Sequence, residues 1–352
     1  MPPAERRVLI LERPRRARFA AERLPAPGRG DVVVRPLLST FKHGTEMMAY
    51  LGRTPFARRR FDPALRLFEP VKGANAFYPR PMGSMMVGTV EWAGADAARL
   101  RPGMRVYAWA PVADRHVLPA AAVHPLGRLA PEQALCIDPA SFALGGVIDG
   151  AVRAGETVLV TGLGAIGLFA IQYCVAAGAT VIAASRFARR RALARAFGAS
   201  AVHDTAAVAD LARLVKRRSG GVDVAIECSS NLAALDRAIR ATRQCGRVVC
   251  VGFHGGETGR LDLGAEFYHN RLTLLASLPA LRWGNPVRGP RPLYAADLQR
   301  RVARDLGRGT IRADGMLTPV LPFADAPRAV RLIAGAPEAV IKVALAHEPG
   351  AA

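Results

Sequence analysis

The sequence predicts a two-domain α/β protein, with an antiparallel β-barrel domain followed by a doubly wound parallel-sheet domain. Up to about residue 145, short strand-like runs such as 87–92 are separated by Pro-Gly turns. From about residue 150, apolar runs alternate with helical stretches, which is typical of βαβ units. A glycine-rich segment at 162–167 directly follows the first of these runs. With 352 residues, the chain is long enough for two hydrophobic cores.

The expected elements of the second half follow from its hydrophobic pattern. Parallel strands are expected at 157–161, 180–184, 222–227 and 247–252, and helices at 165–177, 189–197 and 232–242. Two more helical stretches and a final strand at 340–346 follow residue 290. In the first half, residues 54–81 are rich in Arg, Pro and aromatic side chains and lack periodicity, which indicates a long loop.

The charge of the chain is strongly positive, with 49 basic and 28 acidic residues and a formal net charge of +21. Such a charge favours anionic partners, for example nucleic acid, a phosphorylated substrate or a phosphorylated cofactor. However, the basic runs are not interleaved with aromatic residues, and no common nucleic-acid-binding signature occurs. We therefore interpret most of the excess as arginine on solvated faces.

The apolar segments and the cysteines bear on the cellular compartment. No apolar run reaches the roughly 18 to 20 residues that span a bilayer, and the first residues do not form a signal peptide. None of the five cysteines is part of a Cys-x-x-Cys pair, and four lie in apolar surroundings. We expect a cytoplasmic protein with reduced thiols and no membrane insertion.

The glycine-rich segment has the pattern Gly-x-Gly-x-x-Gly at Gly162, Gly164 and Gly167, with Ala165 and Ile166 inside it. It follows a strand and opens a helix, which is the context that a dinucleotide-binding motif requires. The first glycine allows a tight turn, the second lets the backbone approach the pyrophosphate, and the third allows close helix–strand packing. The free N–H groups of the helix N-terminus favour phosphate. The segment therefore predicts a nicotinamide dinucleotide site.

The end of the second expected strand distinguishes between the two nicotinamide cofactors. NAD enzymes place Asp or Glu there to bind the ribose hydroxyls. This chain instead has Ser185 and Arg186, followed by Arg189 and Arg190. A carboxylate would repel a 2′-phosphate, whereas hydroxyl and guanidinium groups would bind it. We expect NADP(H) rather than NAD(H); alternatively, these arginines only begin a solvated helix.

Over nearly its whole length, the chain resembles the medium-chain dehydrogenase/reductase superfamily, which contains zinc alcohol and polyol dehydrogenases and their zinc-less relatives. The resemblance rests on 152–167, Val-Arg-Ala-Gly-Glu-Thr-Val-Leu-Val-Thr-Gly-Leu-Gly-Ala-Ile-Gly, and on the closing Ile-Lys-Val at 341–343. The segment 41–46, Phe-Lys-His-Gly-Thr-Glu, is similar to a zinc-independent branch that includes bacteriochlorophyllide dehydrogenase-like proteins.

The resemblance implies a domain organisation. A GroES-like catalytic domain is expected at 1–148, a Rossmann NADP(H)-binding domain at 149–288, and a segment returning to the catalytic domain at 289–352. Lys342 matches a basic residue near the cofactor pyrophosphate, and Trp283–Pro286 would form part of the substrate cleft. The family also suggests a homodimer or homotetramer.

The zinc ligands of the superfamily are not retained. Zinc members have Cys-Gly-Thr-Asp where this chain has His43-Gly44-Thr45-Glu46, and Gly-His-Glu where it has Gly83-Ser84-Met85. The position of their third ligand falls at or next to Asp138, and the four-cysteine structural zinc lobe is missing. Zinc prefers three good nitrogen, sulfur or carboxylate ligands plus water. We therefore expect no bound metal.

The resemblance suggests which residues would replace the metal. His43 occupies the vacated position and could exchange the substrate proton, with Asp138 as its orienting partner. Thr45 matches the family's substrate-contacting hydroxyl and would hold the reacting oxygen. Lys42 is a second candidate, since a cation stabilises a developing alkoxide. Alternatively, His43 only makes hydrogen bonds within a packed loop.

Together, these features predict a zinc-independent, NADP(H)-dependent dehydrogenase of a secondary alcohol, polyol or sugar, or the matching ketone reductase. The basic surface would suit an anionic small-molecule substrate. A competing hypothesis is an enone or quinone reductase, although reducing a double bond needs no acid/base pair at His43 and Asp138. A third hypothesis is a nucleic-acid-binding protein that keeps only the fold, which the intact glycine motif argues against.

Overall fold

The computed structural model describes residues 5–62, 64–65, 67–71, 77–255, 261–278 and 295–348. The chain forms two compact units, one made of Met1–Leu135 with Leu317–Ala352 and the other of Cys136–Met316. The expected cleft residues Trp283–Pro286 lie outside the described residues, as does the expected domain boundary at residue 288.

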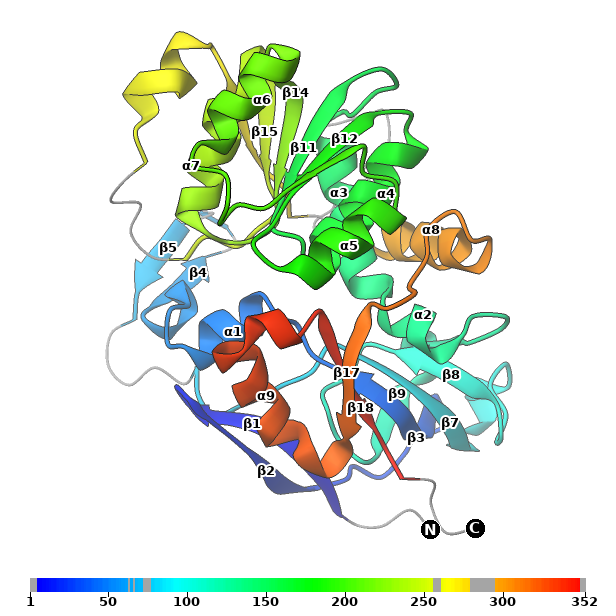
Figure 1. Ribbon diagram of the computed structural model, residues 1–352. Coiled ribbons are helices and arrows are strands. Elements are labelled where there is room, and N and C mark those ends of the chain that lie inside the picture. Colours follow the sequence, from blue (N-terminus) through cyan, green and yellow to red (C-terminus); the bar gives the residue numbers. More distant parts are fainter. Residues whose placement is uncertain are drawn as a thin grey trace. The chain divides into compact units, whose positions relative to one another are not determined.

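The unit formed by 136–316 contains a six-stranded parallel sheet in the order β13-β12-β11-β14-β15-β16 (Figure 1). Counted along the chain, this order is 3-2-1-4-5-6, that of a doubly wound dinucleotide-binding sheet. The strand order reverses between β11 and β14, so the carboxyl ends of these strands form the switch point where such sheets bind ligands. The strands are β11 (Thr157–Thr161), β12 (Thr180–Ala184), β13 (Ala201–His203), β14 (Val222–Glu227), β15 (Thr242–Cys250) and β16 (Thr273–Ala276).

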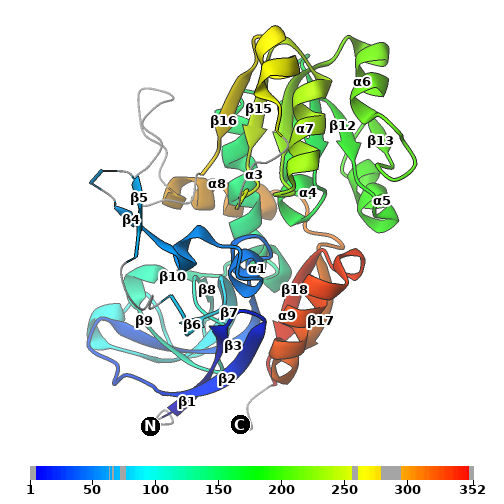
Figure 2. The same ribbon diagram turned by 90° about the vertical axis from the view of Figure 1, so that its left-hand side faces the viewer.

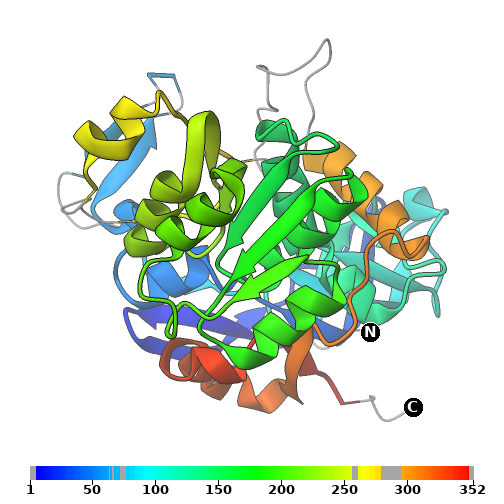
Figure 3. The same ribbon diagram turned by 45° about the horizontal axis from the view of Figure 1, so that its top comes forward.

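Helices cover both faces of this sheet, as Figure 3 shows. Helices α6 and α7 pack together against β14, whereas α3 packs against α4 and α8. Local signals set the helix ends: the Asp210 carboxylate accepts the Arg213 N–H at the start of α6, and Gly220 ends it with φ of +72°. The helices are α3 (Ile137–Asp149), α4 (Ala165–Ala176), α5 (Ala188–Ala196), α6 (Leu211–Ser219), α7 (Leu232–Ala241), the π-helical turn η4 (Leu263–Phe267) and α8 (Ala295–Gly307).

The expected fold class is confirmed, and the elements of the parallel-sheet unit match their expected ranges closely. The strands expected at 157–161, 180–184 and 222–227 are found with those bounds. The helices expected at 165–177 and 232–242 end one residue earlier, and the helix expected at 189–197 begins and ends one residue earlier. The strand expected at 247–252 starts earlier and ends earlier, at Thr242–Cys250. Its first part pairs with β14 through an irregular register that a single-segment pattern does not predict.

The other unit consists mainly of antiparallel strands (Figure 2). Its largest sheet has the order β10-β8-β7-β3-β18-β17, with β9 also pairing with β3, and a second sheet has the order β2-β1-β6. Strand β18 pairs antiparallel with β3, placing Ala344 opposite Thr40, and so ties the C-terminal part of the chain to the N-terminal part. The strands are β1 (Glu5–Arg13), β2 (Arg16–Arg23), β3 (Asp31–Thr40), β6 (Arg80–Pro81), β7 (Met85–Ala93), β8 (Arg105–Ala108), β9 (His116–Pro119), β10 (Val123–Pro125), β17 (Leu317–Pro322) and β18 (Lys342–Ala346).

Residues 54–81 are not a continuous loop, so that expectation is wrong in part. The segment contains the two-stranded hairpin of β4 (Arg59–Asp62) and β5 (Leu67–Pro70). The Phe68 ring lies 5.2 Å from the Phe56 ring and 5.1 Å from the Phe61 ring, measured between centroids. These aromatic contacts stabilise the hairpin. Its strands are largely exposed, so the sequence shows no alternation of apolar and polar residues from which they could be predicted.

The two ends of the chain share one hydrophobic core in this unit. Leu9 and Phe41 from the N-terminal part are buried together with Val330 and Val343 from the C-terminal part. The helices of this unit are α1 (Thr45–Tyr50), α2 (Pro131–Leu135) and α9 (Ala326–Gly335).

The compact units meet along the chain at 135/136 and at 316/317, while the domain boundaries expected from the sequence, 148/149 and 288/289, stay a prediction. The reason that the units meet there is packing: α3 lies against α4, and α8 lies against α3, so both helices belong to the parallel-sheet unit.

All five cysteines, Cys136, Cys174, Cys228, Cys245 and Cys250, are free thiols. Burial raises the pKa of Cys174 to about 12, which keeps this thiol protonated and unreactive at neutral pH. In the part of the chain that the structure describes, no helix has the length and apolar character needed to cross a bilayer.

Two histidines in the antiparallel unit lie in surroundings that favour the neutral ring. The side chain of His116 is fully buried, and neither ring nitrogen has a hydrogen-bond partner among the described residues. Burial, with a contribution from the nearby Arg6, lowers the pKa of His116 to about 3. The His347 ring stacks on Phe323 with 4.4 Å between centroids, and burial lowers its pKa to about 4. Protonation of either ring therefore opposes folding.

These pKa values predict a loss of stability in mild acid. Above pH 6.5 both rings are neutral whether the chain is folded or unfolded; below it, only the unfolded chain takes up protons, down to the folded pKa. The free energy of unfolding should therefore fall by about 2 kcal/mol per histidine between pH 7 and pH 5. In urea titrations at both pH values, His116→Gln should remove about 2 kcal/mol of this change. The control His269→Gln, at an exposed ring, should not. An unaltered pH dependence in His116→Gln would contradict the assignment.

Candidate active site

The glycine turn lies at the carboxyl end of β11, at the switch point of the sheet. Gly162 adopts φ of +81°, and a Cβ added to it would lie 2.5 Å from the backbone nitrogen of Ser229. A Cβ on Gly167 would overlap the carbonyl oxygen of Gly162. Only glycine fits at these two positions, because the turn is pressed against the loop that follows β14 and against its own helix.

The N-terminus of α4 is open in front of this turn. Gly164 is the N-cap of the helix, no side chain caps it, and no atom lies within 4 Å of the position that a Gly164 Cβ would take. Ala165 and Ile166 begin the first turn, whose N–H groups have no partner within the helix. This cradle of backbone N–H groups and empty space fits the pyrophosphate of a dinucleotide.

The end of β12 gathers the residues expected to select the cofactor. Ser185 is buried, and its hydroxyl accepts a hydrogen bond from Phe187 N at 3.2 Å. The guanidinium carbons of Arg186 and Arg190 lie 4.7 and 4.5 Å from the centroid of the Phe187 ring. Arg191 forms an ion pair with Asp204 at 2.8 Å. The structure thus brings Arg186 and Arg190 together around the Phe187 ring, and Ser185 contacts the backbone of the same residue.

Sequence reasoning missed a buried carboxylate at the switch point. Glu227, the last residue of β14, has no exposed side-chain surface. It accepts hydrogen bonds from the Ser229 N–H at 2.6 Å and from the Ser229 hydroxyl, and its Oε2 lies 2.9 Å from His254 Nε2. The sequence feature that could have indicated this carboxylate is the acidic residue at the end of the apolar run 222–227. Because Ser229 packs against Gly162, Glu227 supports the shape of the nucleotide turn.

His43 lies directly after β3, in the antiparallel unit. Its Nε2 accepts a hydrogen bond from the backbone N–H of Val343 at 3.1 Å, and Thr40 Oγ1 donates to the Val343 carbonyl oxygen at 2.6 Å. With Nε2 acting as an acceptor, the neutral imidazole carries its proton on Nδ1. Proton uptake at Nε2 requires the bond to Val343 to break.

Glu46 links the segment around His43 to the segment around Ser84, the two segments that were compared with zinc-ligand motifs. Its carboxylate accepts the Lys42 N–H at 2.6 Å through one oxygen and the Gly83 N–H at 2.7 Å through the other. Burial raises the pKa of Glu46, while these two backbone donors partly offset the shift. The Glu46 side chain therefore links the backbone at residue 42 to the backbone at residue 83. These residues are adjacent in sequence to His43 and Ser84.

The other residues expected to act are dispersed over both units. Thr45 is the exposed first residue of α1, and Lys42 is half-buried just before that helix. Lys342 is buried at the start of β18, adjacent to Val343 in sequence. Asp138 is buried in the first turn of α3, which belongs to the parallel-sheet unit, whereas His43 belongs to the other.

The side chains at the former zinc positions of the antiparallel unit do not fit zinc. The Nε2 lone pair of His43 is used by the Val343 N–H, and the Ser84 hydroxyl donates to the Thr40 carbonyl oxygen at 3.5 Å. Zinc needs ligands with available lone pairs, preferably imidazole, thiolate or carboxylate. Within the described ranges, no group of three or more His, Cys, Asp or Glu side chains is arranged to hold a metal ion.

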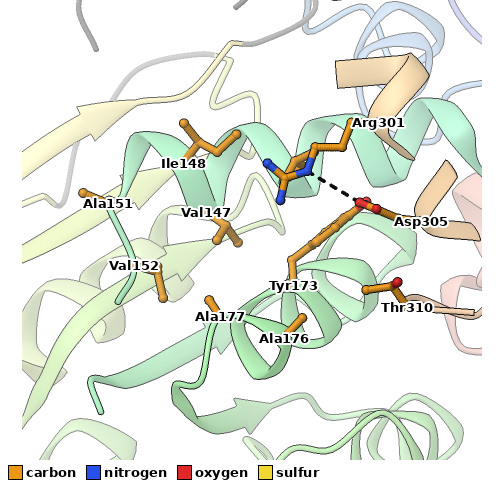
Figure 4. Close-up of a pocket in the computed structure, with 11 residues that line it drawn as sticks. Val147, Ile148, Ala151, Val152, Tyr173, Ala176, Ala177, Arg301, Asp305 and Thr310 are labelled. Carbon is orange, nitrogen blue, oxygen red and sulfur yellow. Dashed lines mark hydrogen bonds and ion pairs between the residues drawn. The ribbon is translucent and has the colours of Figure 1, made fainter. Parts of the chain in front are cut away.

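A separate pocket of about 410 Å³ opens between α3, α4 and α8 (Figure 4). Val147 and Ile148 form an apolar wall, while the Tyr173 hydroxyl donates to Asp305 Oδ2 at 3.3 Å and Arg301 lies 3.7 Å from the same oxygen. Among the described residues, none of those expected to bind the cofactor or to act on the substrate lines this pocket. It is therefore distinct from the nucleotide turn.

A parallel sheet in this order, with a glycine turn at its switch point, defines a dinucleotide-binding α/β protein. Comparisons with known proteins narrow the class. A family model described as zinc-binding dehydrogenase matches residues 165–280. D-guloside 3-dehydrogenase from Escherichia coli (strain K12) is 29% identical over 330 residues, which cover 89% of this chain and 92% of that protein.

Two solved structures share the fold. A protein from Sinorhizobium meliloti 1021 bound to NADP has a TM-score of 0.74 and 23% identity, covering 98% of this chain and 100% of that one. A short chain alcohol dehydrogenase from Escherichia coli CFT073, complexed with NADH, has a TM-score of 0.75 and 19% identity with the same coverage. By these matches the chain is similar to zinc-type dehydrogenases, and its two units have the GroES-like and Rossmann folds.

Because the space next to Gly164 is open, a substitution there can test cofactor binding without disturbing the fold. Gly164→Ala should leave the fold unchanged, because nothing lies near the added methyl group, yet that group would occupy the space through which a pyrophosphate approaches. We expect NADPH binding, measured by fluorescence titration, to weaken about tenfold or more. Gly335→Ala, which also adds a methyl group in open space, is the matched control and should bind normally. Binding within twofold of the wild type in Gly164→Ala would exclude this turn as the site.

Proposed function

We propose that the protein is a zinc-independent, NADP(H)-dependent oxidoreductase that transfers a hydride between the nicotinamide and a secondary alcohol or ketone. The observation that carries this proposal is the glycine cradle at the switch point, with a hydroxyl and two guanidinium groups at the end of the neighbouring strand β12. A protein that kept only the fold and bound no dinucleotide would not need a hydroxyl and two guanidinium groups at this position.

The preference for NADP(H) is supported by the charges at the end of β12. Ser185 stands where NAD enzymes place a carboxylate, and Arg186 and Arg190 both lie against the ring of Phe187, two residues further on. The carboxylate of Asp204 is paired with Arg191 at 2.8 Å. A 2′-phosphate would therefore meet positive charge and a hydroxyl at this position.

Independence of zinc is supported by the hydrogen bonds at the former metal positions. His43 uses Nε2 for the backbone of β18, and Ser84 uses its hydroxyl for the backbone of β3. Both side chains thus stabilise the fold at places where zinc relatives carry ligands.

A sugar or polyol hydroxyl is the substrate group that the comparisons support best. Relatives that align over about nine-tenths of the chain carry the names D-guloside 3-dehydrogenase and L-galactonate-5-dehydrogenase. We propose a secondary hydroxyl of a sugar, polyol or related metabolite, and the corresponding ketone in the reverse direction.

The bound cofactor would supply or accept the hydride, and the chain's own side chains would handle the proton. We propose that His43 exchanges this proton, which requires its Nε2 to release the Val343 N–H, and that Asp138 orients the charged ring. Thr45, exposed at the start of α1, would hold the reacting oxygen, and Lys42 would stabilise negative charge on it.

Turnover without metal tests the chemistry. After chelation, NADPH absorbance should change with secondary alcohols or sugars plus NADP⁺, and with ketones plus NADPH. His43→Ala should lower kcat by about 10² or more, since positioned acid/base groups contribute about that much. His124→Ala, a histidine on β10, is the control. A twofold loss in His43→Ala would remove His43 from the reaction, and turnover of enones alone would show a double-bond reductase instead.

Cofactor preference tests the arginines separately. In Arg186→Ala/Arg190→Ala, kcat/KM for NADP⁺ should fall by about 10², because each charge-assisted hydrogen bond to a phosphate contributes about 1.5 kcal/mol. The value for NAD⁺ should change less than about threefold. Arg195→Ala removes the same charge from the last turn of the same helix and should leave the preference intact. Equal losses with both cofactors would contradict recognition of the 2′-phosphate.

A further inference from the structure

Phe187 occupies an unusual place between β12 and α5. It is the half-buried N-cap residue of the helix, and its backbone N–H donates to the Ser185 hydroxyl at 3.2 Å. The guanidinium carbons of Arg186 and Arg190 lie 4.7 and 4.5 Å from its ring centroid. Both distances are within the range of attractive cation–π contacts, so one ring holds two cations.

Without the ring, this arrangement would be unfavourable. Two guanidinium groups that lie against the same ring repel each other, and each is carried on a long side chain with many rotamers. The negative faces of an aromatic ring attract both cations and restrict their positions. Phe187 therefore gathers two positive charges at the end of β12 before any ligand binds.

The first turn of α5 adds to the positive potential. Arg189, Arg190 and Arg191 lie in this turn, and the turn has no acidic residue. Cations at a helix N-terminus oppose the helix dipole and destabilise the helix, whereas an anion placed there would offset both the dipole and the arginines. Arg191 is neutralised by Asp204 and also donates to the Ser185 carbonyl oxygen at 2.9 Å, which fixes the loop backbone.

We propose that Phe187 is a positioning residue that presents Arg186 and Arg190 as one preformed site for a phosphate dianion, namely the 2′-phosphate of an adenine nucleotide. This inference rests on the proposed NADP(H) function and extends it. The ring itself makes no hydrogen bond to the phosphate. It reduces the loss of side-chain freedom when the two guanidinium groups bind.

Binding of two small nucleotides to the intact protein tests the inference without catalysis. Isothermal titration with 2′,5′-ADP and with 5′-AMP measures what the 2′-phosphate adds to affinity. The wild type should bind 2′,5′-ADP at least about tenfold more tightly than 5′-AMP. Phe187→Leu should weaken 2′,5′-ADP binding about five- to tenfold and change 5′-AMP binding less than about twofold. Phe187→Tyr, which keeps the ring, should restore the wild-type ratio.

The matched control is Phe197→Leu at the other end of α5, where the Arg312 guanidinium lies 5.6 Å from the ring centroid. This pair should not affect the ratio of the two affinities. If Phe187→Leu proves unstable, Phe187→Met, with an unbranched side chain and no ring, makes the same comparison. A wild-type ratio retained in the variant that lacks the ring overturns the inference and leaves the NADP(H) proposal standing. Equal affinities of the wild type for both nucleotides overturn the NADP(H) proposal itself.

Discussion

The close contact between the two loops at the switch point is the constraint on which the nucleotide site depends. Gly162 has no room for a side chain because Ser229 lies against it, and Ser229 is held there by the fully buried Glu227. A buried carboxylate is stable only when hydrogen bonds satisfy it, and here the backbone and hydroxyl of Ser229 do so. The shape of the turn therefore follows from a polar network below it as much as from its own glycines.

Hydrogen bonds connect separate segments of the antiparallel unit around His43. Glu46 bridges the backbone at residues 42 and 83, and His43 bonds to β18. Loss of the Glu46 carboxylate would remove the acceptor of the Lys42 and Gly83 N–H groups.

The large positive charge has a structural component. Arginines pair with buried or half-buried carboxylates in both units, for example Arg115 with Glu91 at 2.7 Å and Arg247 with Glu156 at 2.6 Å. Such pairs use the planar guanidinium group to link separate strands and loops. The arginines around Phe187 differ, because their neighbourhood concentrates positive charge at the start of a helix.

The sequence by itself determined the βαβ units, the glycine turn, and the presence of Ser185 and Arg186 where NAD enzymes have a carboxylate. Each of these features is encoded within one short segment by periodicity or spacing. Only the tertiary structure decided the contacts between distant segments. Glu227 reaching His254, Glu46 reaching Gly83 and His43 reaching Val343 all depend on how separate elements pack. The hairpin at 59–70 and the ring of Phe187 between two arginines also depend on side-chain geometry. The pattern of a single segment shows which of its side chains are apolar and on one side, but it does not show which residues of another segment will contact them.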